Sequence, residues 1–228
     1  MAIYAISDLH LSFDVNKPMN VFGKLWDNYE EKIKEDWISK VKENDTVIIP
    51  GDISWGMTLK EIKKDFKYID DMPGKKIILK GNHDYYFTTK TKLENFFKEC
   101  NFNSINILYN NAIELEEYVL CGTRGWGSNE SKDLDLDKKL IRREEIRLEN
   151  SLMQGKKISN GKKDILVAMH FPPFTGKFCD IMKNYNVKKC IYGHLHGFGH
   201  TMVKEGIIDG IEYVMVSCDF TKFKLVRL

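Results

Sequence analysis

The sequence lacks C-x-x-C pairs and long hydrophobic runs, and it has almost no excess of charge of one sign. Its five cysteines are odd in number and widely spaced, which excludes a zinc knuckle and a disulfide framework and predicts a reduced protein. The longest apolar run is Met1–Ile6, whereas a membrane-spanning helix needs about 20 residues. That run also lacks a basic flank, so we expect no signal peptide, no membrane contact and a cytoplasmic location.

The charges are balanced, with 35 basic and 33 acidic residues and a net charge of +2 when histidine is neutral. Basic and acidic residues are interleaved, as in Lys60–Asp65, which predicts a solvated surface. This balance argues against bulk binding of nucleic acid through charge. Because 43% of the 228 residues are hydrophobic and 12% are aromatic, we expect one sizeable core and a single domain over residues 1–228.

Short β-branched runs alternate with longer segments of helical spacing, which predicts an α/β protein. Several runs are apolar at consecutive positions, as expected of strands buried on both faces. The expected strands are Ala2–Ser7, Thr46–Pro50, Lys76–Lys80, Ile113–Cys121, Ile165–Met169, Lys189–Tyr192 and Ile211–Ser217. The strand-rich end of the chain suggests a second sheet. The expected helices cover Phe22–Val41, Leu59–Ile69 with Thr58 as N-cap, and about Asp133–Met153.

Polar side chains with metal-binding chemistry follow five of the predicted strands. In open α/β sheets, ligands bind outside the carboxyl ends of the strands. The strand ends carry three carboxylates, five of the six histidines and one carboxamide. Packing of a hydrophobic core does not explain so many polar groups there, so we infer a metal site. These residues are Asp8, His10, Asp52, Asn82, His83, Asp84, His170, His194 and His196.

The donor types and their spacing indicate which metals fit. Asp8 and His10 are two positions apart, so an extended backbone would direct both to one ion and turn Leu9 into the core. His194 and His196 have the same spacing. Mixed nitrogen and oxygen donors favour manganese, iron or zinc over calcium, which prefers oxygen alone. The sequence therefore predicts two divalent or trivalent transition-metal ions.

The ordered motifs D-x-H, G-D, G-N-H-D, H and G-H-x-H resemble those of the calcineurin-like metallophosphoesterase family. They run from Asp8 to His196, so the resemblance covers nearly the whole chain. It implies two mixed β-sheets packed as a sandwich and flanked by helices, in four layers. It also implies a catalytic histidine at His83, which contacts the substrate phosphate or the leaving group, and an Asp84 that orients it. The implied ligands are Asp8, His10, Asp52 and His196 for one ion and Asp52, Asn82, His170 and His194 for the other, with Asp52 bridging.

The implied reaction is hydrolysis of a phosphate ester. Two ions that share a water lower its pKa and hold hydroxide for in-line attack on phosphorus. The ions also neutralise charge on the phosphoryl oxygens, and His83 donates to the leaving oxygen. We expect a phosphate mono- or diester as substrate, a small phosphorylated molecule that includes nucleotide-like ones. The choice between these, the native metals and the oligomeric state stay open.

The surroundings of the motifs narrow the branch of the family. Asp52 is not followed by the acidic-arginine-glycine signature of the protein phosphatases, and Trp55 stands where purple acid phosphatases have a tyrosine ligand. The chain thus resembles the small bacterial-type phosphohydrolases. Trp55, Arg124 and Trp126 are candidate substrate-binding residues. Arg124 can bind a phosphate with two hydrogen bonds, Trp126 can stack on a base or aryl leaving group, and Trp55 can line the cleft. Alternatively, Trp126 is buried under the long charged helix and Arg124 pairs with an acid there.

A non-catalytic metal-binding scaffold or interaction protein on the same fold is the competing interpretation. Scaffolds of this family have lost ligands and the catalytic histidine, whereas this chain has every ligand and His83. A single structural zinc site is the weaker option, because such sites are usually rich in cysteine and no cysteine falls within these motifs. The retained motifs therefore favour an enzyme.

Overall fold

The computed structural model describes residues 1–228 and divides into two compact units with one mixed β-sheet each. The first unit consists of Met1–Ile107 and Val216–Leu228, and the second of Leu108–Met215. Each sheet has four adjacent parallel strands and at least one antiparallel strand at an edge. Two mixed sheets with flanking helices form the α/β fold that the sequence predicted.

The sheet of the first unit has the strand order β11-β1-β2-β3-β4. The four strands β1 to β4 are parallel, and β11 pairs with β1 in the antiparallel direction. Parallel neighbours need a crossover connection, and helices supply it here. The strands are β1 (Ile3–Ala5), β2 (Thr46–Ile49), β3 (Lys75–Ile78), β4 (Ile105–Ile107) and β11 (Val226–Arg227).

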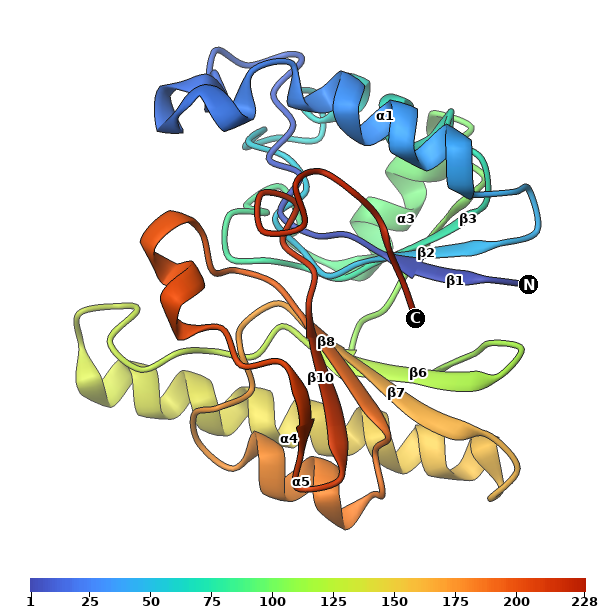
Figure 1. Ribbon diagram of the computed structural model, residues 1–228, viewed down its shortest axis with the longest axis vertical. Coiled ribbons are helices and arrows are strands. Elements are labelled where there is room, and N and C mark those ends of the chain that lie inside the picture. Colours follow the sequence, from blue (N-terminus) through green and yellow to red (C-terminus); the bar gives the residue numbers. More distant parts are fainter. The chain divides into compact units, whose positions relative to one another are not determined.

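Three α-helices and two 3-10 turns connect these strands. Tyr29, Ile33 and Trp37 recur at helical spacing and are the buried residues of α1, which lies over the sheet in Figure 1. Helix α3 begins after Thr89, whose side chain accepts a hydrogen bond from the Lys92 N–H. The helical elements are η1 (Met19–Phe22), η2 (Lys24–Trp26), α1 (Tyr29–Lys40), α2 (Lys63–Asp70) and α3 (Lys90–Glu99).

The sheet of the second unit has the strand order β5-β6-β7-β8-β10-β9. Strands β6, β7, β8 and β10 are parallel, while β5 and β9 are antiparallel edges. Figure 1 shows α4 and α5 along one face of this sheet. The elements are β5 (Ile113–Glu114), β6 (Tyr118–Thr123), α4 (Leu134–Ser159), β7 (Asp164–Met169), α5 (Phe178–Asn184), β8 (Lys189–Tyr192), η3 (Gly197–Met202), β9 (Gly206–Ile208) and β10 (Ile211–Met215).

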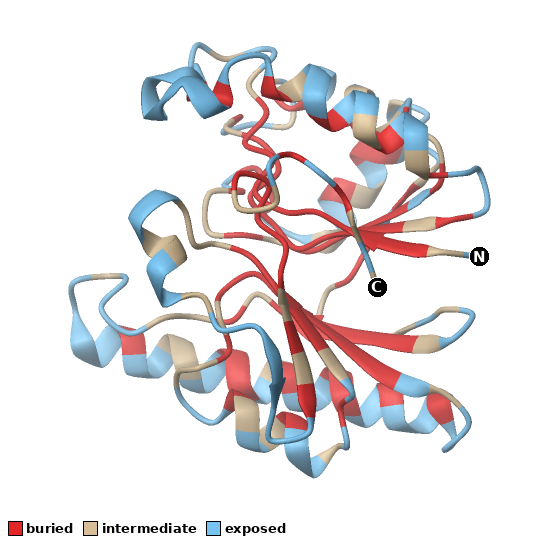
Figure 2. Cartoon of the chain, in the orientation of Figure 1, coloured by how far each residue is buried: buried red, intermediate tan, exposed pale blue.

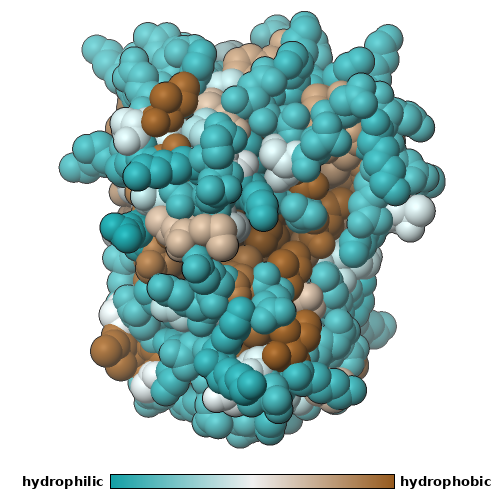
Figure 3. Space-filling view, turned by 90° about the vertical axis from the view of Figure 1, so that its right-hand side faces the viewer, coloured by the Kyte–Doolittle hydropathy of each residue, from teal (hydrophilic) through white to brown (hydrophobic).

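Burial follows the parallel strands, as the consecutive apolar runs predicted. In β7 and β8, every residue except the first is buried. Figure 2 shows the inner strands largely buried and the helices with buried and exposed positions along their length. The face in Figure 3 is mainly hydrophilic, in keeping with the interleaved charges. None of the helices is both long and apolar enough to cross a membrane.

Some predicted elements have different bounds in the structure. The segment Ile113–Cys121, expected as a strand with hairpin-like character, is a hairpin of β5 and β6. The chain reverses at the exposed Glu116 and Glu117, where the Leu115 N–H donates to the Tyr118 carbonyl at 2.8 Å. Thr58 is not the N-cap of α2. Its hydroxyl instead accepts from Glu61 N–H at 3.4 Å in a turn that precedes the helix.

The helix expected over Phe22–Val41 begins only at Tyr29, after two 3-10 turns. Gly23 separates these turns with a φ of 124°, a conformation that does not continue a helix. Among the strands and α-helices, those that the sequence did not predict are β4, β9, β11, α3 and α5. Apart from α3 they are short, so periodicity carries little signal in them. By contrast, the charged segment from Asp133 is helical, and the Asp133 side chain caps it by accepting from the N–H groups of Asp135 and Leu136.

Helix α4 approaches β6 closely at Gly155. A Cβ added there would overlap the Cys121 Sγ and would lie 3.6 Å from Val119 and 3.7 Å from Ala112. We expect Gly155→Ala to lower the free energy of unfolding by about 1–2 kcal/mol, since the overlap outweighs the gain of about 1 kcal/mol in helix propensity.

The energy of this contact is measured by urea unfolding of Gly155→Ala, Cys121→Ala and the double variant Gly155→Ala/Cys121→Ala. Removal of the thiol creates the missing space, so the double variant should be more stable than the sum of the single effects predicts. Strict additivity would show that Cys121 does not limit the approach of α4.

Candidate functional site

In the first unit, the predicted ligands follow three neighbouring parallel strands. Asp8 follows β1, Asp52 follows β2, and the Gly81–Asp84 segment follows β3. Because parallel strands have their carboxyl ends at one edge, these side chains gather there, as the sequence analysis predicted. Asp8, His10 and Asp52 are all buried.

The side chains of Asp8, His10 and Asp52 converge. One potential ligand atom of Asp8 lies within 4.8 Å of one from His10, and the same holds for Asp8 and Asp52. The His10 Nε2 is 3.9 Å from the Asp52 Oδ2. Two buried carboxylates and an imidazole that lie this close to one another form a mixed set of oxygen and nitrogen donors. Such a set fits a transition-metal ion.

The backbone at these ligands is left-handed, with φ of 60° at Asp8, 47° at His10 and 51° at Asp52. The extended backbone that the D-x-H spacing suggested is therefore wrong for Asp8 and His10, although Leu9 is fully buried as expected. Such φ values are uncommon outside glycine and cluster at functional sites.

Backbone hydrogen bonds between the first two motifs hold this conformation. Asp8 N–H donates to the Gly51 carbonyl and His10 N–H to the Asp52 carbonyl, both at 3.0 Å, and Leu11 N–H donates to Ile53 at 2.9 Å. The two loops are thus joined residue by residue. Their pairing, rather than strand alternation, brings Asp8 and His10 together.

Asp84 is a buried carboxylate that joins the second and third motifs. It accepts hydrogen bonds from the N–H groups of Gly81 at 2.7 Å and of Asp52 and Ile53 at 2.9 Å, and from the Tyr86 hydroxyl at 2.9 Å. Burial raises the pKa of Asp84, and these donors oppose that rise. The carboxylate thus joins, through backbone hydrogen bonds, the loop that carries Asp52 to the loop that carries His83.

Gly81 and His83 contact the Asp52 side chain directly. The His83 N–H donates to Asp52 Oδ1 at 2.8 Å. A Cβ on residue 81 would overlap the Asp52 carboxylate and its N–H, so only glycine fits at this close approach. These contacts orient the carboxylate that the family resemblance assigns as the bridge.

Side chains outside the predicted ligand set hold Asp8 and His10 by hydrogen bonds, one from the adjacent Ser7 and two from residues distant in the sequence. The hydroxyls of Ser7 and Ser217 donate to Asp8 Oδ2, the latter at 2.7 Å, and the Tyr29 hydroxyl donates to the His10 carbonyl at 2.8 Å. Such outer hydrogen bonds orient metal ligands. Sequence reasoning missed Ser217 and Tyr29, because no motif connects them with Asp8 or His10.

In the second unit, His170 follows β7 and His194 and His196 follow β8, its parallel neighbour. The rings of His170 and His194 are 5.1 Å apart at 75°. His194 has a φ of 75°, and its Nε2 is 3.5 Å from the Glu130 Oε1. The second unit therefore also brings predicted ligands together at the carboxyl edge of its sheet.

Arg124 and Trp126 follow β6 and contact residues of α4. The Arg124 Nη2 is 4.0 Å from the buried Glu144, and its guanidinium lies 4.7 Å above the Trp126 ring. The Trp126 Nε1 donates to the Asp137 carboxylate at 2.8 Å, and its ring packs on Phe171 at 5.0 Å. The Arg124–Glu144 pair is the contact that the alternative to substrate binding described, whereas Trp126 is half-buried rather than buried. The substrate role of both residues stays a prediction.

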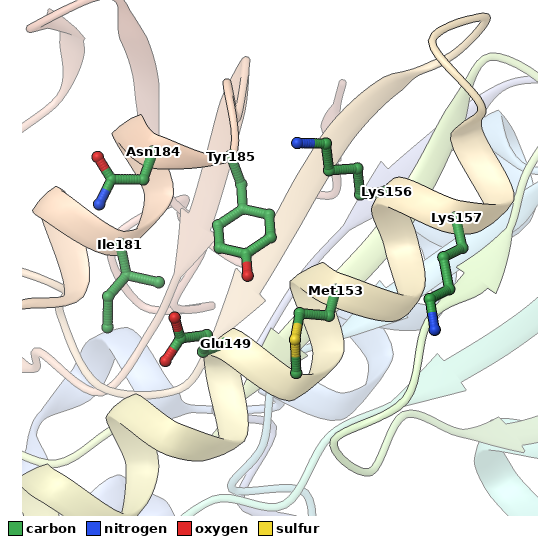
Figure 4. Close-up of a pocket in the computed structure, with 7 residues that line it drawn as sticks. All are labelled: Glu149, Met153, Lys156, Lys157, Ile181, Asn184 and Tyr185. Atoms are coloured by element: carbon green, nitrogen blue, oxygen red, sulfur yellow. The ribbon is translucent and has the colours of Figure 1, made fainter.

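Figure 4 shows a cavity of about 630 Å³ between α4 and α5. These helix ends immediately precede β7 and β8, so the cavity lies towards the amino ends of the strands. The ligand histidines follow the opposite ends, and the cavity therefore contributes nothing to this candidate site. Its lining residues are Glu149, Met153, Lys156, Lys157, Ile181, Asn184 and Tyr185.

The model of the calcineurin-like phosphoesterase family matches residues 1–198, and the chain belongs to this family. The Gene 66 protein of Mycobacterium phage L5 is 40% identical over 81 residues, which are 34% of this chain and 37% of that protein. The chain thus spans little more than a third of that relative. Family membership and the converging donors support a phosphoesterase with a metal site.

Solved structures show a similar fold at low sequence identity. A phosphopantetheinyl hydrolase from Mycobacterium tuberculosis has a TM-score of 0.58 at 15% identity, with 100% of this chain and 95% of that chain covered. The protein TT1561 of Thermus thermophilus has a TM-score of 0.57 at 10% identity, with 100% and 97% covered. At these identities the likeness concerns the fold alone.

Asp65 on α2 links the loop after Asp52 to the segment after His10. Its fully buried carboxylate accepts from the Phe13 N–H at 2.9 Å and from the Ser54 hydroxyl. Burial raises the pKa of Asp65 to about 6, with its hydrogen bonds opposing the rise. This value exceeds the pKa of about 3.9 in the unfolded chain, so ionisation of Asp65 lowers the free energy of unfolding. The loss is complete above about pH 6 and is absent below about pH 3.9.

We therefore expect the wild type to gain about 1 kcal/mol of unfolding free energy relative to Asp65→Asn between pH 7 and pH 5. Urea unfolding of metal-free protein at both pH values measures this difference. Asp71→Asn, at an exposed carboxylate just beyond the same helix, controls for the loss of a charge. A constant difference between wild type and Asp65→Asn would contradict the raised pKa.

Proposed function

We propose that this protein hydrolyses phosphate mono- or diesters with the help of two transition-metal ions, manganese, iron or zinc. The observation that carries the proposal is the convergence of Asp8, His10 and Asp52 at the carboxyl ends of β1 and β2. Membership of the calcineurin-like phosphoesterase family supports it. The proposed ligands are Asp8, His10, Asp52, Asn82, His170, His194 and His196.

When bound, the ions would supply hydroxide for in-line attack on phosphorus and neutralise the phosphoryl oxygens. The chain's own residues then position the ligands and handle the leaving group. Asp52 is oriented by the His83 N–H, and Asp8 by the hydroxyls of Ser7 and Ser217. The His83 imidazole donates a proton or hydrogen bond to the leaving oxygen. Asp84 supports this step by holding the loop that carries His83.

The proposed substrate is a small phosphorylated molecule, with nucleotide-like esters among the candidates. Arg124 is proposed to bind a phosphoryl oxygen. Its side chain is 16% exposed and follows β6, and the planar guanidinium can donate two parallel hydrogen bonds to a phosphate. The proposal also includes a cytoplasmic location, which the free thiols of all five cysteines support, and one domain that contains both compact units.

A non-catalytic metal-binding scaffold is the alternative. The retained His83 weighs against it, because a scaffold has no need of the family's catalytic histidine. Hydrolysis of a chromogenic phosphodiester and the matching monoester by manganese-loaded protein, with metal content measured on the same sample, separates the two. Full metal occupancy without turnover of either ester would favour the scaffold.

We expect His83→Ala to keep both metal ions and to lose most of its turnover, by about 100-fold or more, since a positioned acid contributes roughly 10²–10⁴-fold. Turnover of the better chromogenic ester and metal content by elemental analysis measure the two effects. Asp52→Asn is the matched comparison, because it should lose metal as well as activity. Full activity of His83→Ala would refute the catalytic assignment.

Arg124→Ala should raise KM for the same ester about tenfold, because it removes a charged hydrogen bond to the phosphate. Arg142→Ala on α4 is the control, since Arg142 is an exposed arginine that likewise pairs with a glutamate of this helix, Glu145, at 3.2 Å. Steady-state kinetics of both variants decide between binding and support of the fold. An unchanged KM and kcat in Arg124→Ala would contradict the substrate role and would leave Arg124 with a structural role through Glu144 and Trp126.

A further inference from the structure

We propose that Trp55 is a positioning residue, which holds the imidazoles of His10 and His83 and is itself held in place by Lys17 and Met19. The inference rests on the proposed function for the roles of the two histidines. It assigns a task to the segment Phe13–Gly23, which no motif explains. It also differs from the expectation that Trp55 lines the substrate cleft.

The Trp55 ring contacts both imidazoles within the first unit. Its centroid is 4.7 Å from that of His10 with an angle of 18° between the planes, which is a stacked pair. The His83 ring is 4.6 Å away at 56°. The two imidazoles are 5.8 Å apart, edge to face. A single indole thus contacts a proposed metal ligand and the proposed catalytic histidine.

The remaining surface of the indole is also in use. The Lys17 ammonium lies 3.7 Å from the ring centroid, a cation–π contact. Since the parallel His10 ring covers one face, the ammonium covers the other. The indole N–H donates to the Met19 sulfur at 3.2 Å. With both faces and the N–H engaged, Trp55 has no face left for a substrate base, and its contacts restrict the two histidines instead.

The segment that provides Lys17 and Met19 is anchored to the same loops. Phe13 N–H bonds to the buried Asp65, which also binds Ser54 beside Trp55. Asp14 forms an ion pair with Lys64 at 2.5 Å. Within the segment, the Ser12 hydroxyl donates to the Lys17 carbonyl at 3.0 Å. The position of Lys17 is therefore fixed relative to the loop that carries Trp55.

This arrangement predicts which kinetic constant Trp55 controls. Residues that orient metal ligands typically change metal affinity or activity by about 10–100-fold when replaced. A positioning residue should therefore lower manganese affinity and kcat while KM stays close to the wild-type value. A substrate-stacking residue would do the reverse, with a raised KM and an unchanged manganese affinity.

The experiment compares Trp55→Phe, Trp55→Ala, Lys17→Met and the double variant Lys17→Met/Trp55→Ala with the wild type. Free manganese is followed by electron paramagnetic resonance during titration, and kcat and KM are measured with the chromogenic ester. Imidazole signals of His10 in metal-free protein report the ring-current shift that a stacked indole causes. Phe22→Ala and Lys24→Met are the controls, since both residues are exposed and belong to η1 and η2 of the same region.

We expect about a tenfold loss of manganese affinity and of kcat in Trp55→Ala, partial recovery in Trp55→Phe, and about a threefold loss in Lys17→Met. The Lys17→Met effect should vanish in the Trp55→Ala background, because Lys17 acts through the indole. The two control variants should behave as the wild type.

Unchanged manganese affinity and kcat in folded Trp55→Ala would overturn the inference, and so would a Lys17→Met effect that persists without Trp55. If Trp55→Ala does not fold, Trp55→Phe and the exposed Lys17→Met provide the same test. Failure of the proposed function is separate: the wild type would bind manganese yet hydrolyse no ester, while the manganese and imidazole measurements would still test Trp55.

Discussion

The first unit's candidate site depends on the hydrogen bonds of the buried Asp84 carboxylate. A carboxylate removed from water is costly, and here backbone N–H groups of two different loops and a tyrosine hydroxyl offset that cost. Because the donors belong to the loops after β2 and β3, satisfying Asp84 also fixes the distance between them. The hydrogen bonds to Asp84 therefore also fix the positions of Asp52 and His83, which these loops carry.

The same physical solution recurs at the first motif. Asp8, His10 and Asp52 have left-handed backbone, which costs free energy at residues other than glycine. The paired backbone hydrogen bonds between the two loops offset this cost, and hydroxyls from Ser7 and Ser217 orient the Asp8 carboxylate. These proposed ligands are thus held by hydrogen bonds within the protein itself, as a preorganised metal site would require.

Aromatic side chains have different positions in the two units. Trp55 lies against His10 and His83 in the first unit, whereas Trp126 is anchored by Asp137 and packs on Phe171 in the second. Both residues were candidate substrate-binding residues, Trp126 by stacking on a ring of the substrate and Trp55 by lining the cleft. Contacts on both faces of the Trp55 indole indicate a supporting role, while the role of Trp126 in substrate binding stays a prediction.

The amino-acid sequence by itself determined the alternation of strands and helices, the residues at the strand ends and the resemblance to the family. These features are local, because consecutive apolar residues, glycine turns and motif order can be recognised without knowledge of distant contacts. Sequence reasoning also predicted the helix after Asp133 and the strand Lys189–Tyr192. It failed for the N-cap at Thr58 and for the extended backbone at Asp8, where nearby hydrogen bonds with Glu61 and with the Asp52 loop override the local pattern.

Only the tertiary structure decided how the candidate ligands are supported. The Asp52 N–H donates to Asp84, which is 32 residues away, and Ser217 is 209 residues from Asp8. Lys17 contacts Trp55 from a segment without regular hydrophobic spacing. Hydrogen bonds and ring contacts of this kind depend on where the folded chain brings atoms together. A sequence states which donors and acceptors exist, but the fold selects which of them meet.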